Sequence, residues 1–201
     1  MTLRLYVIRH GETEWSRSGQ HTGRTDLPLT ARGENEAREL IPWLRHIRFA
    51  CVLTSPLQRA RRTCELAALG AAMEIEPDLA EWDYGDYEGR LSRDIRQERP
   101  GWNVFRDGCP NGEQAQQVSD RADRLIARLC TLDGNVALFS HGQFSRALAA
   151  RWIESLIVVG QHLSLDTAAL SVLGFDPSHP EVRVIELWNA APAALAGGPS
   201  S

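Results

Sequence analysis

Residues 3–11 read LRLYVIRHG, an alternating run of branched residues that leads directly into Arg9, His10 and Gly11. The alternation over residues 3–8 predicts a first β-strand, and the polar stretch from His10 to about residue 29 predicts a loop. Ligands of open α/β sheets bind beyond the carboxyl ends of the strands. The sequence therefore places His10 where such a sheet carries its functional site.

Helices and strands alternate along the rest of the chain. A helix capped by Thr30 is expected to reach residue 44, followed by a strand at 51–54, a helix from Ser55-Pro56 to 69 and a strand at 73–75. Further helices are predicted near 92–98, 114–132 and 143–154, with strands at 135–139, 168–175 and 182–187, the last two placed to form a hairpin. This order predicts an α/β fold, a three-layer α/β/α sandwich with a mostly parallel central sheet.

A chain of 201 residues is expected to form a single domain, which we assign to residues 1–189. Within it, residues 77–112 carry Trp, Tyr, Gly and Pro without regular periodicity. We interpret them as an irregular excursion over the active site. Residues 190–201 are small residues, Pro and Gly, and are predicted to be a disordered tail.

Charge and composition exclude several classes of function. The net charge of -4 gives no general attraction to nucleic acid or to an anionic membrane, and we expect neither as a partner. All 22 basic residues are arginine, so the chain can form neither a lysine Schiff base nor a Walker-type phosphate loop. An anion site must therefore consist of Arg, His and backbone N–H groups.

The four cysteines, Cys51, Cys64, Cys109 and Cys130, show no spacing that suits zinc, and we expect neither a metal nor another cofactor. They are interpreted as reduced thiols. The apolar run at the N-terminus is too short for a signal peptide, and no stretch is long enough for a membrane helix. The sequence thus predicts a cytoplasmic protein.

Two further motifs follow predicted strands. SPLQRA at residues 55–60 lies at a helix start, where backbone N–H groups favour an anion and Arg59 could reach one. SHG at residues 140–142 again joins a strand to a helix. Each motif is weak alone, but Arg9-His10-Gly11 followed by both of them is a specific combination.

With LTARG at residues 29–33, these motifs stand in the order found in the histidine phosphatase superfamily, the phosphoglycerate-mutase-like proteins, which the sequence resembles over about residues 3–188. The resemblance implies that His10 is the nucleophile and that its other ring nitrogen donates to the carbonyl of Gly11. Arg9, Arg59 and a cationic His141 would form the phosphate pocket. Glu81 would protonate the leaving oxygen from a partly desolvated position, with Asp83 as a weaker contender.

A narrower resemblance, to the sedoheptulose-bisphosphatase-like branch, rests on EWSRSGQHTG at 14–23, TDLPLT at 25–30 and EWDYGDYEG at 81–89. It implies that the substrate is a small phosphorylated molecule, by membership of this branch a sugar (bis)phosphate. On this basis the candidate substrate contacts are Ser16, Gln20, Thr22, Gly23 and Tyr84, and Arg146 could take a second phosphate.

The sequence thus predicts a metal-independent phosphatase that hydrolyses a phosphomonoester through a phosphohistidine on His10. A phosphoglycerate mutase and a protein phosphatase acting on phosphohistidine or phosphotyrosine remain alternatives. The segment between Glu81 and His141 is short for a mutase, and Ser16 replaces the usual Asn. The bulk of residues 77–112 favours a small molecule over a protein. The oligomeric state stays open.

Overall fold

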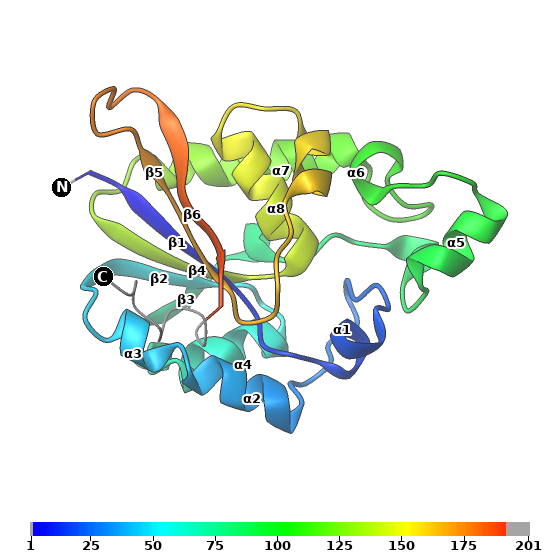
Figure 1. Ribbon diagram of the computed structural model, residues 1–201, viewed down its shortest axis with the longest axis horizontal. Coiled ribbons are helices and arrows are strands. Elements are labelled where there is room, and N and C mark those ends of the chain that lie inside the picture. The colour runs from blue at the N-terminus through cyan, green and yellow to red at the C-terminus, as the bar shows by residue number, and fades with distance from the viewer. Residues whose placement is uncertain (1, 192–201) are drawn as a thin grey trace, which may run out of the picture.

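The computed structural model describes residues 2–191. Most of the predicted tail, residues 192–201, lies outside the described residues, and Ala190 belongs to a strand, so the predicted boundary at 190 is too early. Six strands form a mixed sheet in the order β3-β2-β4-β1-β5-β6 (Figure 1). The strands are β1 (Arg4–Arg9), β2 (Phe49–Thr54), β3 (Met73–Ile75), β4 (Asn135–Ser140), β5 (Leu170–Phe175) and β6 (Arg183–Ala190).

The four strands β1 to β4 run parallel, β5 is antiparallel to β1, and β6 is antiparallel to β5. This arrangement confirms the mostly parallel sheet and the predicted hairpin. The carboxyl ends of β1, β2 and β4 consequently lie at the same edge of the sheet.

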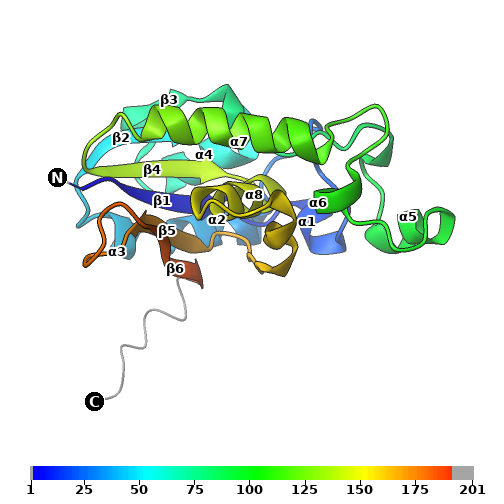
Figure 2. The ribbon, with the colours of Figure 1, turned by 90° about the horizontal axis from the view of Figure 1, so that it is seen from above.

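Helices cover both faces of the sheet, as Figures 1 and 2 show. They are α1 (Glu14–Ser18), α2 (Ala31–Arg38), α3 (Ile41–Leu44), α4 (Gln58–Leu66), α5 (Ser92–Glu98), α6 (Val104–Asp107), α7 (Ala115–Leu129) and α8 (Gly142–Trp152). α7 and α8 pack on one face, and α2, α3 and α4 pack on the other. Short 3₁₀ turns occupy residues 70–72, 77–79, 85–87 and 157–162.

The buried residues of β4 show how the sheet divides the core. Val136 and Leu138 belong to the cluster beneath α7 and α8, whereas Ala137 and Phe139 belong to the cluster beneath α2, α3 and α4. All four side chains are fully buried. A strand buried on both faces reads as a continuous apolar run, which fits a central strand of a three-layer sandwich.

The predicted helix over residues 30–44 is in fact two helices, α2 and α3, separated at Glu39 and Leu40. Pro42 lies in the first turn of α3. Proline has no N–H, and its ring would clash with the carbonyl four residues earlier in a continuous helix. The apolar periodicity crosses this break, and the single-helix prediction was wrong for that reason.

Helix α4 begins two residues later and ends three residues earlier than predicted. Ser55 does not cap it, because the Ser55 hydroxyl accepts from the N–H of Leu57 at 3.3 Å, before the helix begins, and its own N–H continues the sheet, donating to the carbonyl of Phe139 at 2.9 Å. Instead the N–H of Gln58 donates to the carboxylate of Asp26 at 2.8 Å. At the other end, Ala68 adopts a positive φ of 65°, which no helix interior accommodates.

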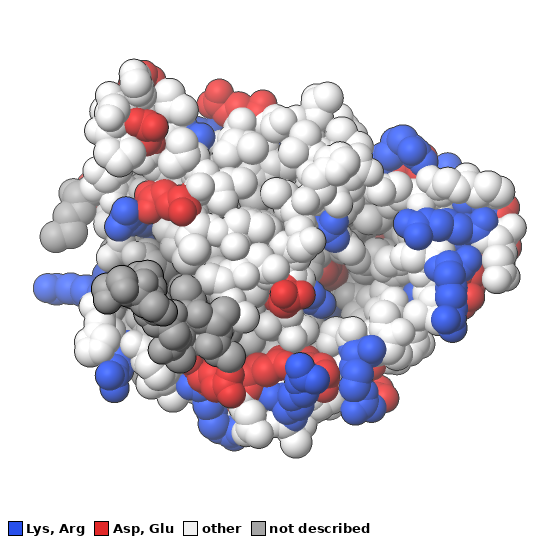
Figure 3. All heavy atoms as spheres, viewed as in Figure 1, with Lys and Arg blue, Asp and Glu red and all other residues white. Residues whose placement is uncertain are grey.

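The excursion at residues 77–112 contains the predicted helix α5 and the shorter α6, which was not predicted. It projects beyond the sheet edge, and blue arginine side chains gather around its α5 end (Figure 3). Trp82 and Trp102 are buried and join the excursion to the main core cluster. In residues 2–191, no helix is both long enough and apolar enough to cross a membrane.

Candidate active site

The three motifs meet at the edge where β1, β2 and β4 end. The N–H of His10 donates to the carbonyl of Ser140 at 3.0 Å, so the segment after β1 continues to pair with β4. The rings of His10 and His141 consequently lie next to each other, with their centroids 5.2 Å apart and their planes inclined at 61°. Residues far apart in the sequence are brought together because parallel strands end at one edge.

His10 has the hydrogen bonding and charge state of a nucleophile. Its side chain is 4% exposed, and its Nδ1 lies 2.7 Å from the carbonyl oxygen of Gly11, which confirms the predicted hydrogen bond. Burial lowers the pKa of His10 well below its ordinary value, and the charges of Arg59 and Arg9 add to this effect. The ring is therefore neutral with the proton on Nδ1, and the lone pair of Nε2 is free to attack.

His141 is not the cation that the sequence led us to expect. Burial, followed by the charges of Arg59 and His10, lowers its pKa well below the ordinary value. Nε of Arg59 donates to Nδ1 of His141 at 3.2 Å, so Nδ1 carries no proton, and Nε2 lies 2.7 Å from the hydroxyl of Ser55. The positive charge beside His10 comes from the arginines.

Arg9, at the end of β1, is poised for an anion. Its Nη1 donates to the carbonyl of Leu165 at 2.5 Å, but its buried Nε has no hydrogen-bond partner within residues 2–191. Burial lowers the pKa of Arg9, which means that the folded protein does not fully compensate the charge. A bound phosphate would supply that compensation.

Arg59 is fully buried and mainly organises the neighbouring loop. Besides its bond to His141, it donates from Nη1 to the carbonyl of Thr25 at 2.9 Å and from Nη2 to those of Thr22 at 3.1 Å and Gly23 at 2.9 Å. A guanidinium has five N–H donors, so one N–H of Nη1 remains for a ligand. Arg59 thus links the loop after α1 to His141.

Glu81 is half-buried and held by three backbone donors. Its Oε1 accepts from the N–H groups of Trp82 and Phe144, both at 2.8 Å, and its Oε2 accepts from Gln143 at 3.0 Å. Two of these donors belong to the first turn of α8. Asp83 lies elsewhere, paired with Arg24 at 2.8 Å and accepting from the N–H of Gly85 at 3.0 Å.

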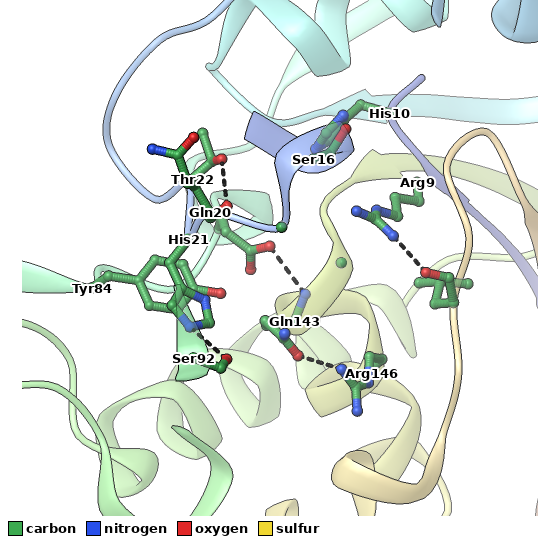
Figure 4. Close-up of a pocket in the computed structure, with 14 residues that line it drawn as sticks. Arg9, His10, Ser16, Gln20, His21, Thr22, Tyr84, Ser92, Gln143 and Arg146 are labelled. Atoms are coloured by element: carbon green, nitrogen blue, oxygen red, sulfur yellow. Dashed lines mark hydrogen bonds between the residues drawn. The ribbon is translucent and has the colours of Figure 1, made fainter. Parts of the chain in front are cut away.

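A cavity of about 220 Å³ opens beside His10, and Figure 4 shows its lining. The predicted residues Arg9, His10, Ser16, Gln20, Thr22, Glu81, Tyr84 and Arg146 all line it. The predicted residues Arg59 and His141 do not line it. Gly23 does not line the cavity, because its N–H donates to Glu88 and its carbonyl accepts from Arg59. Asp83 does not line it either.

Tyr84 and Arg146 line the cavity and keep hydrogen-bond donors for a ligand. Burial, and secondarily Glu81, raises the pKa of Tyr84 well above its ordinary value, so its hydroxyl keeps its proton and can donate. Arg146 donates to the carbonyls of Gly160 at 2.9 Å and Gln161 at 3.0 Å and to the side chain of Gln143 at 2.6 Å. Two of its five N–H groups therefore remain for a ligand.

The sequence interpretation missed three polar residues that line the cavity, His21, Ser92 and Gln143. His21 stacks on Tyr84 with centroids 4.5 Å apart, and its Nε2 lies 3.0 Å from the hydroxyl of Ser92. Because His21 lies between two predicted substrate contacts, Gln20 and Thr22, the sequence could have indicated that it lines the site. For Ser92 the sequence offered no such signal, because it reaches the site through tertiary pairing of residues 20 and 21 with residues 89–91.

In the part of the chain that the structure describes, no three His, Cys, Asp or Glu side chains are grouped to hold a metal ion. The chemical groups at the cavity are instead a neutral histidine, two arginines, a half-buried carboxylate and the N–H of Gly142. That N–H opens helix α8 and has no acceptor within the helix. Such a set can bind a phosphoryl group and transfer it to a ring nitrogen.

Comparisons with known proteins show to which family the chain is similar. The family model of the histidine phosphatase superfamily (branch 1) matches residues 5–189. The chain is 39% identical to an acid phosphatase of Mycobacterium tuberculosis, over 97% of each chain. It is 40% identical to a sedoheptulose 1,7-bisphosphatase of Saccharomyces cerevisiae, over 76% of this chain and 68% of that protein. A solved structure from Mycobacterium tuberculosis superposes with a TM-score of 0.90 at 36% identity, covering 96% of this chain and 100% of that one.

Proposed function

The chain belongs to branch 1 of the histidine phosphatase superfamily and is a phosphoric monoester hydrolase, and from this we propose that it hydrolyses small sugar phosphates, without a metal, through a phosphohistidine on His10. The observation that carries the proposal is the state of His10. Its ring is neutral, its Nδ1 is engaged by the carbonyl of Gly11, and its Nε2 faces the cavity edge with Arg9 beside it.

In the first step, Nε2 of His10 forms a bond to phosphorus while the ester P–O bond breaks. The leaving oxygen takes the electron pair and a proton from the carboxyl group of Glu81. The guanidinium of Arg9, the remaining N–H of Arg59 and the N–H of Gly142 compensate the charge of the phosphoryl oxygens. Oε2 of Glu81 accepts only one hydrogen bond and is the oxygen that carries this proton.

In the second step, water attacks phosphorus and gives a proton to Glu81, which the first step left as a carboxylate. The P–N bond breaks, and its electron pair returns to Nε2. The products are an alcohol and inorganic phosphate, and both His10 and Glu81 regain their initial states. The proton that Glu81 gives to the leaving oxygen in the first step is thus replaced by the proton that it takes from water in the second.

The proposed substrate class rests on the size and polarity of the cavity. About 220 Å³ suits a small polyol phosphate, and Tyr84, Gln20, Thr22 and Gln143 offer hydrogen bonds to hydroxyl groups. Arg146 keeps two N–H groups for a further anionic group. The similarity to a sedoheptulose 1,7-bisphosphatase supports a sugar bisphosphate. The four thiols of the described chain are free, which suits the reducing cytoplasm where we propose that the enzyme acts.

The proposal is tested by measuring phosphate release in the presence of EDTA from sugar mono- and bisphosphates, 3-phosphoglycerate and an aryl phosphate. We expect the highest kcat/KM for a sugar bisphosphate. We expect His10→Ala to lower kcat at least about a thousandfold and to abolish an acid-labile phosphoenzyme. His179→Ala, an exposed histidine near the β5–β6 turn, is the matched control and should leave both unchanged.

Other outcomes would replace parts of the proposal. Conversion of 3-phosphoglycerate to its 2-isomer, without phosphate release, would identify a mutase. Release from phosphohistidine or phosphotyrosine peptides in preference to every sugar phosphate would identify a protein phosphatase. Full activity of His10→Ala would eliminate the phosphohistidine mechanism itself.

A further inference from the structure

The peptide group that joins Gly11 to Glu12 is engaged at both of its ends. Its carbonyl oxygen accepts from Nδ1 of His10 at 2.7 Å. Its N–H donates to Oε2 of Glu36, on helix α2, at 2.9 Å. One planar peptide therefore lies between the nucleophile and a carboxylate that does not line the cavity.

The carboxylate of Glu36 is held in place by its own helix. Its Oε1 accepts from Nε of Arg32, one turn earlier, at 3.0 Å, and its side chain is 17% exposed. Acidic and basic side chains interleave over α2 on the surface seen in Figure 3. Arg32 orients Glu36, but it does not displace the N–H of Glu12.

Close packing of two glycines brings α2 within reach. A Cβ on Gly11 would overlap the carbonyl of Gly33, and a Cβ on Gly33 would overlap the backbone of Glu12. The first turn of α2 therefore touches the backbone that follows His10 without an intervening side chain. This contact brings the side chains of α2 close enough for one of them to reach the N–H of Glu12.

We propose that Glu36 is a positioning residue that acts on His10 through the Gly11–Glu12 peptide, an inference that rests on the proposed phosphohistidine mechanism. Hydrogen bonds in a chain polarise one another, so a carboxylate on the N–H strengthens the carbonyl as an acceptor. The stronger acceptor holds the proton on Nδ1 and keeps Nε2 unprotonated. It also stabilises the positive charge that the ring gains when Nε2 forms its bond to phosphorus and Nδ1 retains its proton.

The peptide thus does for His10 what a directly bonded carboxylate does for a catalytic histidine elsewhere. The difference is distance, because the charge of Glu36 remains one peptide away from the phosphate. A carboxylate in direct contact with His10 would repel an anionic substrate, whereas this arrangement leaves the cavity side of the ring to Arg9. Glu36 therefore supports the nucleophile without opposing substrate binding.

The test compares Glu36→Ala and Glu36→Gln with Glu34→Ala, a control on the same helix whose carboxylate pairs with Arg38 and Arg62 at the surface. Rapid-quench kinetics with an aryl phosphate measures the rate at which the phosphoenzyme forms. We expect Glu36→Ala to lower this rate about tenfold at an unchanged KM. Glu36→Gln, whose carbonyl can still accept from Glu12, should recover most of the loss, and Glu34→Ala should match the wild type.

Nitrogen-15 NMR of His10 supplies a readout that simple loosening of α2 would not move. In the wild type Nδ1 carries the proton, and in Glu36→Ala we expect a measurable fraction of the ring with the proton on Nε2. An unchanged tautomer and an unchanged phosphorylation rate in Glu36→Ala would overturn the inference. Absence of a phosphoenzyme in the wild type would instead overturn the proposed function, so the two failures are distinguishable.

Discussion

Arg59 and Arg9, the two arginines near His10, have different hydrogen-bond partners. Arg59 donates to three loop carbonyls and to His141, whereas Arg9 donates to the carbonyl of Leu165 and keeps a buried Nε without a partner in the described chain. Removing a donor from buried carbonyls costs about 1–3 kcal/mol for each group left unsatisfied. The two side chains should therefore separate stability from phosphate binding.

We expect Arg59→Met to lower the free energy of unfolding by about 3 kcal/mol or more, because several buried carbonyls lose their donor. Arg9→Met should change it by about 1 kcal/mol at most, because the loss of one hydrogen bond is offset by removal of a poorly compensated buried charge. Urea unfolding of both variants, with and without inorganic phosphate, measures this. Phosphate should stabilise the wild type but not Arg9→Met, and equal destabilisation by the two substitutions would contradict the assignment.

At the scale of single residues, the sequence predicted which motifs meet and one hydrogen bond, from His10 to the carbonyl of Gly11, but not the other hydrogen bonds of the site. Strand-end motifs sufficed to place His10, Arg9 and His141 at one edge. The neutral state of His141 could not be predicted, because it depends on Arg59 approaching from α4 and on burial beneath the loop. Gly23 was predicted to contact substrate because its sequence neighbours were. The tertiary structure shows that its N–H donates to Glu88 instead.

The loop from Thr22 to Thr25 is clamped between two elements. Arg59 of α4 donates hydrogen bonds to its carbonyls. The carboxylate of Glu88, in the excursion, accepts from the N–H of Gly23 at 2.9 Å and from that of Thr25 at 3.0 Å. The two ionic side chains do not contact each other through a hydrogen bond. They stabilise the same loop from opposite sides, so the excursion helps to fix the donors of the phosphate pocket.

We expect Glu88→Ala to release this loop, raising KM and lowering kcat/KM about tenfold, because misplaced donors compensate the phosphoryl charge poorly. Glu88→Gln keeps one side-chain acceptor and should lose less. Steady-state kinetics on a sugar phosphate measures both. Glu98→Ala, which breaks only the surface pair with Arg90 in the same excursion, is the control. A kcat/KM for Glu88→Ala equal to that of this control would show that the clamp is dispensable.

Elements were predicted better than their ends. All six strands and the helix at residues 92–98 were predicted within a few residues of their observed bounds. The start of α4 was missed because its cap, Asp26, comes from a distant loop. Helix α6, of four residues, is too short to show a period and forms because Asn103 caps it, accepting from the N–H of Phe105 at 2.9 Å.

For the whole molecule, buried neutral histidines determine how stability responds to acid. The pKa of His21 is lowered to about 4, mainly by burial, and those of His10 and His141 lie well below the ordinary value of 6.5. Between pH 6.5 and the folded-state pKa values, the unfolded chain binds protons that the folded protein does not. Stability therefore rises with pH in this window and is lost as the pH falls through it.

We expect the free energy of unfolding to fall by about 1.4 kcal/mol per pH unit for each such histidine as the pH drops well below 6.5. Urea titrations at several pH values from 7 to 4.5 measure the slope. His21→Gln removes one titrating group and should lower that slope by about a third of the combined contribution of the three histidines. An equal slope in wild type and His21→Gln would contradict the assignment.

Strand β1 lies between β4 and β5, and both of these neighbours come from the final third of the chain. During translation, β1 must therefore remain with both edges unpaired until the ribosome has made β4 and β5. Unpaired strand edges are sites of aggregation. The nascent chain should depend on protection of residues 4–9 for most of its synthesis, and catalytic competence should arise late, when β4 docks.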